Sequence, residues 1–452
     1  MHIPPVQRWA GSVASHVLHN LWDWEISIGR IRLGLLNRII IDDINLKDKQ
    51  DSTMLHVSRL AAKLEIIPLF DGKISIANAQ LFGTEAYLYQ RSAQEKPNFQ
   101  FILDTFKSDN TESKPLNLRI GNLVLRRIEV KWDRQWMPRK ETGTFDPSHI
   151  HLQNIALTAR LKVLDADTMN LSLKRLSFKE ASGFEISNIA GDFSSGSNAA
   201  KIEDFCIELP HSTLSIPSFM ATWPDTPKGT DMKKWLGSTS WYAETAIRLT
   251  PSDFKAFVPR LENAHSPIEL TSKLYGLEEC INVPQLNLSN NGSLSLSARL
   301  FVNDYLNNPD YIVEINRLQT NARLQQYLTQ ELNGQGKEIS PLLTRMDTID
   351  LSGRLNISDH HQYGTINIDN RHAEVEITAE AYDWNRLNVS VSSPKIQLDN
   401  LLSDNGKHIL NKATLKVEAS GLIKDNNGNP SIDIHGILPE LVFDGKEYLD
   451  TE

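Results

Sequence analysis

The stretch EISIGRIRLGLLNRIIIDDINLKD, residues 25–48, decides the fold class. Polar and aliphatic residues alternate for four or five positions, the alternation slips by one residue, and it then resumes. Isoleucine and leucine hold one side, whereas Arg30, Arg32, Asp42 and Asp43 hold the other. A period of two is typical of a β-strand. One apolar and one polar face together indicate an antiparallel sheet that is exposed to water on one side only.

The same alternation recurs along the first half of the chain, for example in residues 116–132 and 150–161. Between such runs stand Gly29, Gly121 and Asn154, which we interpret as bulge or tight-turn positions where the side-chain register slips. Repeated bulges supply curvature to a sheet. The sequence therefore predicts a mainly β protein whose long antiparallel sheet curls into an elongated, taco-like groove, with a few short helices.

Composition narrows the class of protein further. The 452 residues include 47 basic and 56 acidic side chains, and the net charge is -9, so the surface is poorly suited to a nucleic acid partner. The hydrophobic share of 40% predicts an ordered structure. Cys206 and Cys280 stand far apart without a CxxC motif, which excludes a disulfide framework as the main source of stability.

The pattern divides the chain into three predicted parts. Residues 1–21 form an amphipathic helix, with apolar residues at spacings of three and four and with Pro4 and Pro5 at its entry. Residues 22–222 form the β groove. After a loop-like segment at 223–235, residues 236–452 continue the groove as loose strand–helix–strand repeats. Their three short helices are predicted after Pro251, around residues 324–332, and within residues 395–423.

Segments that would indicate a membrane helix or a signal peptide are not found. No run reaches the roughly 18 to 20 apolar residues that a membrane helix needs. The first residues also lack the apolar block of a signal peptide.

Motifs for catalysis are also not found in the sequence. It contains no GxGxxG, Walker, HExxH or GxSxG motif, so we expect a protein that is not an enzyme and that needs no cofactor or metal. His149 and His151 would point to the same side of a strand, but no third ligand stands at a useful spacing, which favours exposed strand histidines. A glycoside-cleaving site would require Asp42, Glu65, Asp104 and Asp133 to converge, and no pattern indicates that they do.

The apolar face of so long a sheet must be hidden from water. It can pack under a second sheet as a closed core, or it can line a trough that holds an apolar ligand. For the second case the predicted lining residues are Ile26, Ile28, Ile31, Leu33, Ile74, Ile76, Leu116, Leu118, Ile120, Leu123, Leu125, Ile150, Leu152, Ile155, Leu157, Leu171 and Leu173.

Several consecutive motifs carry a resemblance to a known family. They are PPVQRWAGSVASHVLHNL (4–21), IGRIRL (28–33), IDDINLKD (41–48), MLHVSRLAAKL (54–64) and KPNFQFILDTF (96–106). In this order they resemble the amino-terminal region of the translocation and assembly module (TamB) family, and most closely its large Bacteroidetes versions. The family belongs to the AsmA-like proteins, which are related to the chorein-type bridge-like lipid-transfer proteins.

The resemblance implies a periplasmic protein held in the bacterial inner membrane by a helix just before residue 4. It implies a β groove that crosses toward the outer membrane and ends at a BamA-type outer-membrane β-barrel. Phospholipid transport between the membranes and support of outer-membrane protein assembly are the roles it suggests. On this interpretation the chain is a fragment that lacks both the anchor and the carboxy-terminal domain.

Three functions stay open at this stage. The first is a groove that conducts phospholipid by its acyl chains. The second is a scaffold or chaperone that offers sheet edges to unfolded outer-membrane strands. The third is a carbohydrate-active β-solenoid, in which some of the tryptophans would stack on sugars and the aliphatic residues would form a closed core.

Overall fold

The computed structural model describes most of the chain. The described residues are Gln7, Arg8, Ser12, Ser15, 24–34, 38–64, 74–106, 118–164, 168–225, 231–321, 348–371, 373–396, 410–424, 428–443 and 445–451. The chain forms two compact units. The first contains Met1–Met220 and Leu249–His265, and the second contains Ala221–Arg248 and Ser266–Glu452.

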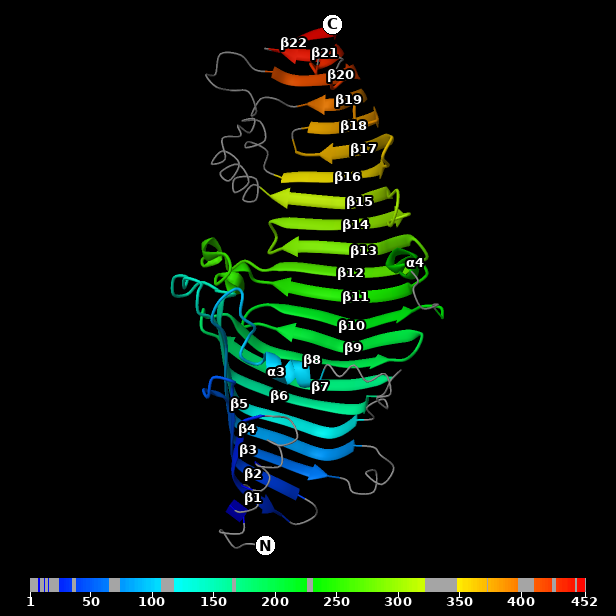
Figure 1. The fold of residues 1–452 in the computed structure, drawn as a ribbon. Helices are drawn as coiled ribbons and strands as arrows, with labels where there is room; N and C mark the ends of the chain where they lie inside the picture. Colours follow the sequence, from blue (N-terminus) through cyan, green and yellow to red (C-terminus); the bar gives the residue numbers. More distant parts are fainter. Residues whose placement is uncertain are drawn as a thin grey trace. The chain divides into compact units, whose positions relative to one another are not determined.

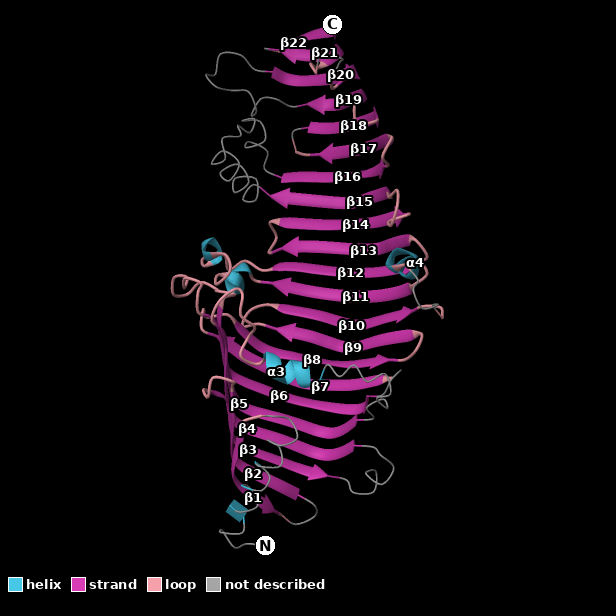
Figure 2. Ribbon diagram, in the orientation of Figure 1, coloured by secondary structure: helices cyan, strands magenta, loops and turns pink. Residues whose placement is uncertain are grey.

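Strands dominate both units, and the 22 described strands belong to a curled sheet (Figures 1 and 2). The first unit contains β1 (Ile26–Leu33), β2 (Arg38–Lys47), β3 (Thr53–Leu64), β4 (Ile74–Gln90), β5 (Leu118–Arg134), β6 (His149–Leu164), β7 (Met169–Glu180), β8 (Glu185–Ser195), β9 (Ala199–Glu208) and most of β10 (Thr213–Thr222). The prediction of a mainly β, curled antiparallel sheet is confirmed.

The second unit continues with shorter strands of similar pattern. They are most of β11 (Ser240–Leu249), and β12 (Ile268–Leu277), β13 (Cys280–Asn290), β14 (Leu294–Asn303), β15 (Asp310–Asn321), β16 (Thr348–Ile357), β17 (His361–Asp369), β18 (Ala373–Tyr382), β19 (Arg386–Ile396), β20 (Leu410–Leu422), β21 (Ser431–Phe443) and β22 (Lys446–Thr451). From β12 to β22 each strand pairs antiparallel with the next.

One pair in the first unit departs from the predicted antiparallel meander. Strands β4 and β5 run parallel, from Ile74 opposite Leu118 to Gln90 opposite Arg134. Parallel neighbours need a crossover of a dozen or more residues, and here it includes the helix α3 (Gln100–Phe106). The alternation in the two strands is the same for either direction, so the sequence pattern alone did not reveal the parallel pairing.

A line of register slips bends the first five strands. On the apolar face the spacing jumps from two to three between Ile28 and Ile31, and the same jump occurs at matched positions of β2 to β5. In β4 and β5 the slip falls at Gly83 and Arg127, which both have positive φ, and in β2 it falls at Asp43. The predicted bulges at Gly29 and Asn154 fall at register slips of the same kind. Gly29 lies against Asp43 of β2, and Asn154 has a positive φ of 54°.

Asp42 connects the strands β1, β2 and β3 on the face of the bend opposite the apolar one. Its carboxylate is 3% exposed and forms ion pairs with three arginines, at 2.8 Å to Arg59, 2.7 Å to Arg32 and 3.2 Å to Arg30. Burial opposes ionisation of Asp42. The hydrogen bond from Arg59 and the charges of Arg32 and Arg59 outweigh burial and hold the pKa of the carboxyl below its usual value.

The helices differ in part from the predictions. The segment 223–235, predicted as a loop, contains the start of α4 (Met232–Gly237), which Asp231 caps. The helix predicted after Pro251 is two 3₁₀ turns, η1 (Pro251–Phe254) and η2 (Pro259–Leu261), because Pro259 interrupts it.

Other predicted helices fall largely where nothing is described. Four described positions of the predicted amino-terminal helix, Gln7, Arg8, Ser12 and Ser15, are helical. The rest of that helix lies outside the described residues. So does the helix predicted at 324–332. Of residues 395–423, where the third helix is predicted, the structure describes the end of β19, the strand β20 and Ile423, and 397–409 lie outside the described residues.

Candidate functional site: an apolar groove

The first unit carries a continuous aliphatic row across its sheet. Successive Cα partners place one isoleucine or leucine from each strand side by side from β1 to β9. The row consists of Ile31, Ile41, Leu60, Leu81, Leu125, Leu157, Leu176, Ile189 and Ile207. Directly opposed residues point to the same side of a sheet, so these side chains form one apolar band.

The predicted lining residues fall on this same face. In the row on one side of this band, Ile28 is the Cα partner of Ile44, and Ile128 is the Cα partner of Ile155. In a third row, Leu123 and Leu173 are both Cα partners of Ala159. The predicted residues on this face are Ile26, Ile28, Ile31, Leu33, Ile76, Ile120, Leu123, Leu125, Ile150, Leu152, Ile155, Leu157, Leu171 and Leu173. Ile74 and Leu118 are Cα partners in β4 and β5, and Leu116 lies outside the described residues.

These side chains are accessible and do not form a sealed core. Leu33 is 55% exposed, and the other predicted lining residues on this face are partly exposed, whereas Ile128 and Ala159 on the same face are buried. Within each unit, the closest contacts between described strands join neighbours in the sheet. The aliphatic face is therefore an open groove surface.

The crossover between β4 and β5 covers part of this face. The ring of Phe99 meets that of Trp132 with centroids 6.0 Å apart, and Phe101 meets Trp24 at 6.2 Å. Trp132 is the Cα partner of Leu88 and Ile150 on the apolar face. The segment before α3 therefore lies against the groove, near the ends of its strands.

The opposite face of the same strands carries polar and charged side chains. Val124 and Thr158 are partners there, immediately beside the groove partners Leu125 and Leu157. The row that contains them also includes Arg32, Gln80 and Arg175, together with the apolar Ile40 and Ala61, so this face mixes polar and apolar side chains. This alternation makes the sheet amphipathic through its thickness.

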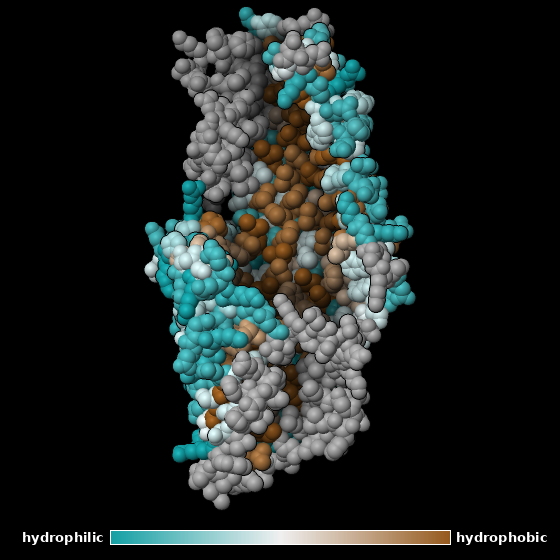
Figure 3. All heavy atoms as spheres, in the orientation of Figure 1, coloured by the Kyte–Doolittle hydropathy of each residue, from teal (hydrophilic) through white to brown (hydrophobic). Residues whose placement is uncertain are grey.

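The second unit repeats the arrangement with its own rows. One row runs from β12 to β18 and consists of Leu270, Leu288, Leu296, Leu318, Leu351, Ile368 and Val375. A second row on the same face includes smaller side chains and consists of Val283, Leu300, Val313, Leu355, Gly364, Ala379, Val389, Ala419 and Ile434. In Figure 3 brown, apolar atoms fill a hollow bordered by teal, polar atoms in this part of the chain.

The small side chains deepen the second groove into a pocket. A cavity of about 190 Å³ is lined by apolar side chains, including Leu355, Ile366 and Ile377 around Gly364 and Ala379. Trp384, 60% exposed, lines it from the β18–β19 turn, where Asp383 and Trp384 both have positive φ. A β-carbon on Gly364 would lie 2.3 Å from Leu355 Cδ2, so glycine keeps this space open.

The histidines considered as metal ligands have carboxylate partners instead. His149 lies between Asp146, at 2.8 Å from Nδ1, and Asp133, at 3.2 Å from Nε2, while His151 contacts Glu129 at 2.5 Å. In the described part of the chain no group of three potential ligands could hold a metal ion.

The carboxylates considered for sugar cleavage take separate partners. Asp42 binds arginines, Asp133 contacts His149, and Asp104 accepts from Gln100 at 2.8 Å. Glu65 lies outside the described residues.

Sequence reasoning omitted many residues of the groove. The omitted ones include Ile41, Leu60, Leu81, Leu176, Ile189 and Ile207, and the rows of the second unit. Their alternation was a usable signal, since each stands in a run of period two. Which of them are neighbours depends on strand pairing.

Comparison of the chain with protein-family models, with curated proteins and with solved structures finds no match. The resemblance to the TamB family thus rests on the sequence motifs alone. Among the described residues, no helix is long and apolar enough to span a membrane.

Proposed function

We propose that this protein binds phospholipids by their acyl chains along its apolar groove and conducts them between membranes, without catalysis. The observation that carries the proposal is the aliphatic row from β1 to β9, whose side chains share one face of the sheet and are partly exposed. Each methylene removed from water contributes about 0.8 kcal/mol, so an acyl chain laid along such a row gains enough to bind.

The cellular setting of the proposal follows from the resemblance stated above. We place the protein in the periplasm, in a chain anchored to the bacterial inner membrane, with a BamA-type barrel as its outer-membrane partner. Support of outer-membrane protein assembly belongs to the same proposal. An open apolar surface of this size needs an occupant, since it otherwise promotes aggregation.

The test replaces two partners in the middle of the row. In Leu125→Glu/Leu157→Glu two charges enter the groove, and phospholipid should no longer co-purify with the protein, because a buried charge costs several kcal/mol. Native mass spectrometry of protein purified from bacterial membranes counts the bound lipids. Wild-type protein without lipid, or a double variant that keeps its lipid, would contradict the proposal.

A matched control lies on the other face of the same two strands. Val124→Glu/Thr158→Glu adds the same charges to the neighbouring register pair, and lipid should remain bound. Circular dichroism of both variants checks that the sheet is retained. If the groove variant unfolds, Leu125→Gln/Leu157→Gln repeats the test without new charge.

A further inference from the structure

We infer that the first unit holds a binding site for the phosphate of an amphiphile's headgroup at the rim of its groove. The site is a cavity of about 380 Å³ where the β2–β3 turn, the end of β4 and the crossover to α3 meet. The lining residues that matter for binding include Lys49, Tyr89, Arg91, Lys96, Phe101 and Asp104. The inference rests on the proposed function, and it names which part of the lipid is recognised.

A buried polar network builds the back of the cavity. Asp48 is 2% exposed and accepts hydrogen bonds from Tyr89 Oη at 2.7 Å and from the backbone N–H groups of Gln50 and Ser52. Asn98 Nδ2 lies 3.4 Å from the same carboxylate and also donates to the Tyr87 carbonyl at 3.1 Å. The turn, the strand end and the crossover are thereby held together, so the cavity is preformed.

The network also sets the charge at the back of the cavity. Burial raises the pKa of Tyr89, and the Asp48 carboxylate raises it further, so the phenol stays a neutral donor. Burial opposes ionisation of Asp48, but the bonds from Tyr89, Ser52, Gln50 and Asn98 keep its pKa below the usual value. The carboxylate oxygens of Asp48 accept these hydrogen bonds within the fold and are not aimed at a ligand.

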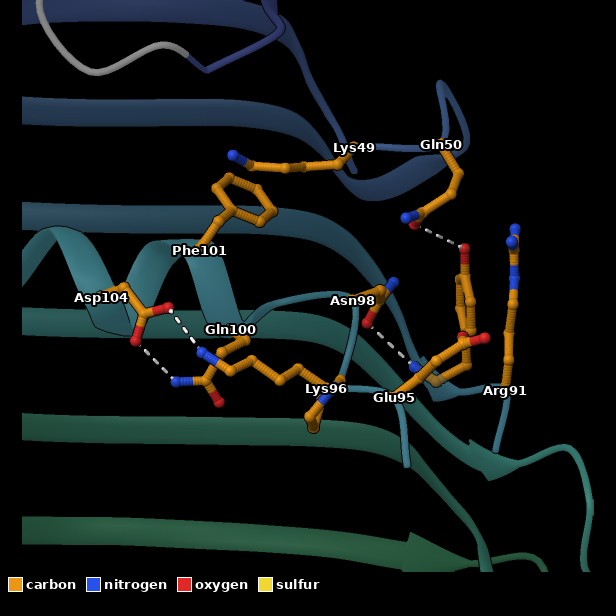
Figure 4. Close-up of a pocket in the computed structure, with 11 residues that line it drawn as sticks. Lys49, Gln50, Arg91, Glu95, Lys96, Asn98, Gln100, Phe101 and Asp104 are labelled. Atoms are coloured by element: carbon orange, nitrogen blue, oxygen red, sulfur yellow. Dashed lines mark hydrogen bonds and ion pairs between the residues drawn. The ribbon is translucent and has the colours of Figure 1, made fainter. Parts of the chain in front are cut away.

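The cations of the cavity are available to an anion. Within the described residues no carboxylate pairs with Lys49 or Arg91, and Arg91 lies over the Tyr89 ring at 5.7 Å. Lys96 Nζ stands 3.7 Å from Asp104, a loose pair between exposed side chains. Figure 4 shows Lys49 and Lys96 at the end of the cavity where Phe101 and Asp104 lie, and Gln50 and Arg91 at the other end.

An apolar path leads from these lysines to the groove. Phe101 lines the cavity and packs on Trp24, two residues before β1, while Phe99 in the same segment packs on Trp132 in the groove. A ligand whose anionic group binds Lys49 or Lys96 can therefore continue as an acyl chain past these rings. Phosphate suits the lysines because charge-assisted hydrogen bonds to it are stronger than neutral ones.

The experiment compares two lipids that differ only in the phosphate. Binding of dioleoyl phosphatidic acid and of dioleoylglycerol to the full chain is measured by competition with a fluorescent fatty acid. Phosphatidic acid should bind about tenfold more tightly, and Lys49→Gln/Lys96→Gln should remove that preference while leaving dioleoylglycerol affinity unchanged. Lys174→Gln/Lys201→Gln removes the same charge from β7 and β9 and should keep the preference.

The outcomes separate this inference from the proposed function. Equal binding of both lipids by wild-type protein, or an unchanged preference in Lys49→Gln/Lys96→Gln, overturns the headgroup site and leaves the groove in place. Failure to bind either lipid overturns the proposed function as well. Inorganic phosphate is the third probe: if it binds at this cavity as tightly as phosphatidic acid does, the site recognises free phosphate and the lipid assignment is wrong.

Discussion

The two units share an apolar face but differ in how polar groups support it. In the first unit, buried carboxylates of Asp42 and Asp48 join several strands or turns each. In the second, the described ion pairs, such as Arg317 with Asp350 and Arg354 with Glu314, join exposed side chains of adjacent strands. Loss of one buried carboxylate leaves several donors without a partner, whereas water replaces an exposed partner.

The apolar rows differ as well, in what lies beside their small side chains. Each unit has one row of large aliphatic side chains and one row that includes small ones, such as Ala62, Ala79 and Ala159 in the first unit and Gly364, Ala379 and Ala419 in the second. In the second unit the small side chains at Gly364 and Ala379 line the pocket beside Trp384. The comparison indicates that buried carboxylates connect elements at the bend and rim of the first unit, whereas small side chains open a pocket in the second.

The largest expected effect on stability is that of Asp48→Ala. It leaves Tyr89 Oη and two backbone N–H groups without their acceptor in a buried place, at a cost of about 3 kcal/mol. Hydrogen exchange of β2–β4, followed by mass spectrometry, should show faster exchange there. Asp433→Ala, at an exposed position of β21, should change nothing in β2–β4. Equal protection of β2–β4 from hydrogen exchange in Asp48→Ala and in the wild type would show that the Asp48 network does not hold these strands together.

Asp42→Asn should destabilise the bend by about 2 kcal/mol, because the ion pairs with the three arginines lose their charge. The pH dependence has a definite sign. The folded pKa of Asp42 is lowered, so its contribution is complete above the unfolded value of about 3.9 and is lost as pH falls below it. The stability of the first unit should therefore fall between about pH 5 and pH 2 in the wild-type protein, and it should fall less in the variant. Identical pH profiles would contradict this role.

Gly364→Ala tests the volume argument in the second unit. The new methyl group meets Leu355 Cδ2 at 2.3 Å, and such overpacking costs about 1 to 2 kcal/mol. It should also reduce quenching of Trp384 fluorescence by a brominated fatty acid, since it fills the pocket. Gly436→Ala is the matched control, because its nearest neighbour would lie 3.7 Å away, and it should behave as wild type.

The smallest effect is expected for Arg317→Ala. Its pair with Asp350 is 2.6 Å long, but the Arg317 side chain is 59% exposed, so no measurable change in the melting temperature should follow. A clear decrease in the melting temperature would show that the second unit also depends on individual ion pairs. The two units would then not differ in how polar groups support them.

The alternation of residues 25–48 by itself determined the strands, the two faces and the slips at Gly29 and Asn154, because side-chain direction in a strand is a local property of period two. Only the tertiary structure decided which strands pair. The parallel pairing of β4 with β5, the row from Ile31 to Ile207 and the cavity between Lys49 and Phe101 all join residues far apart in the chain. Such contacts depend on the entropy lost when distant parts of the chain are brought together and on the free energy gained when they pack. A local sequence pattern does not determine either of these.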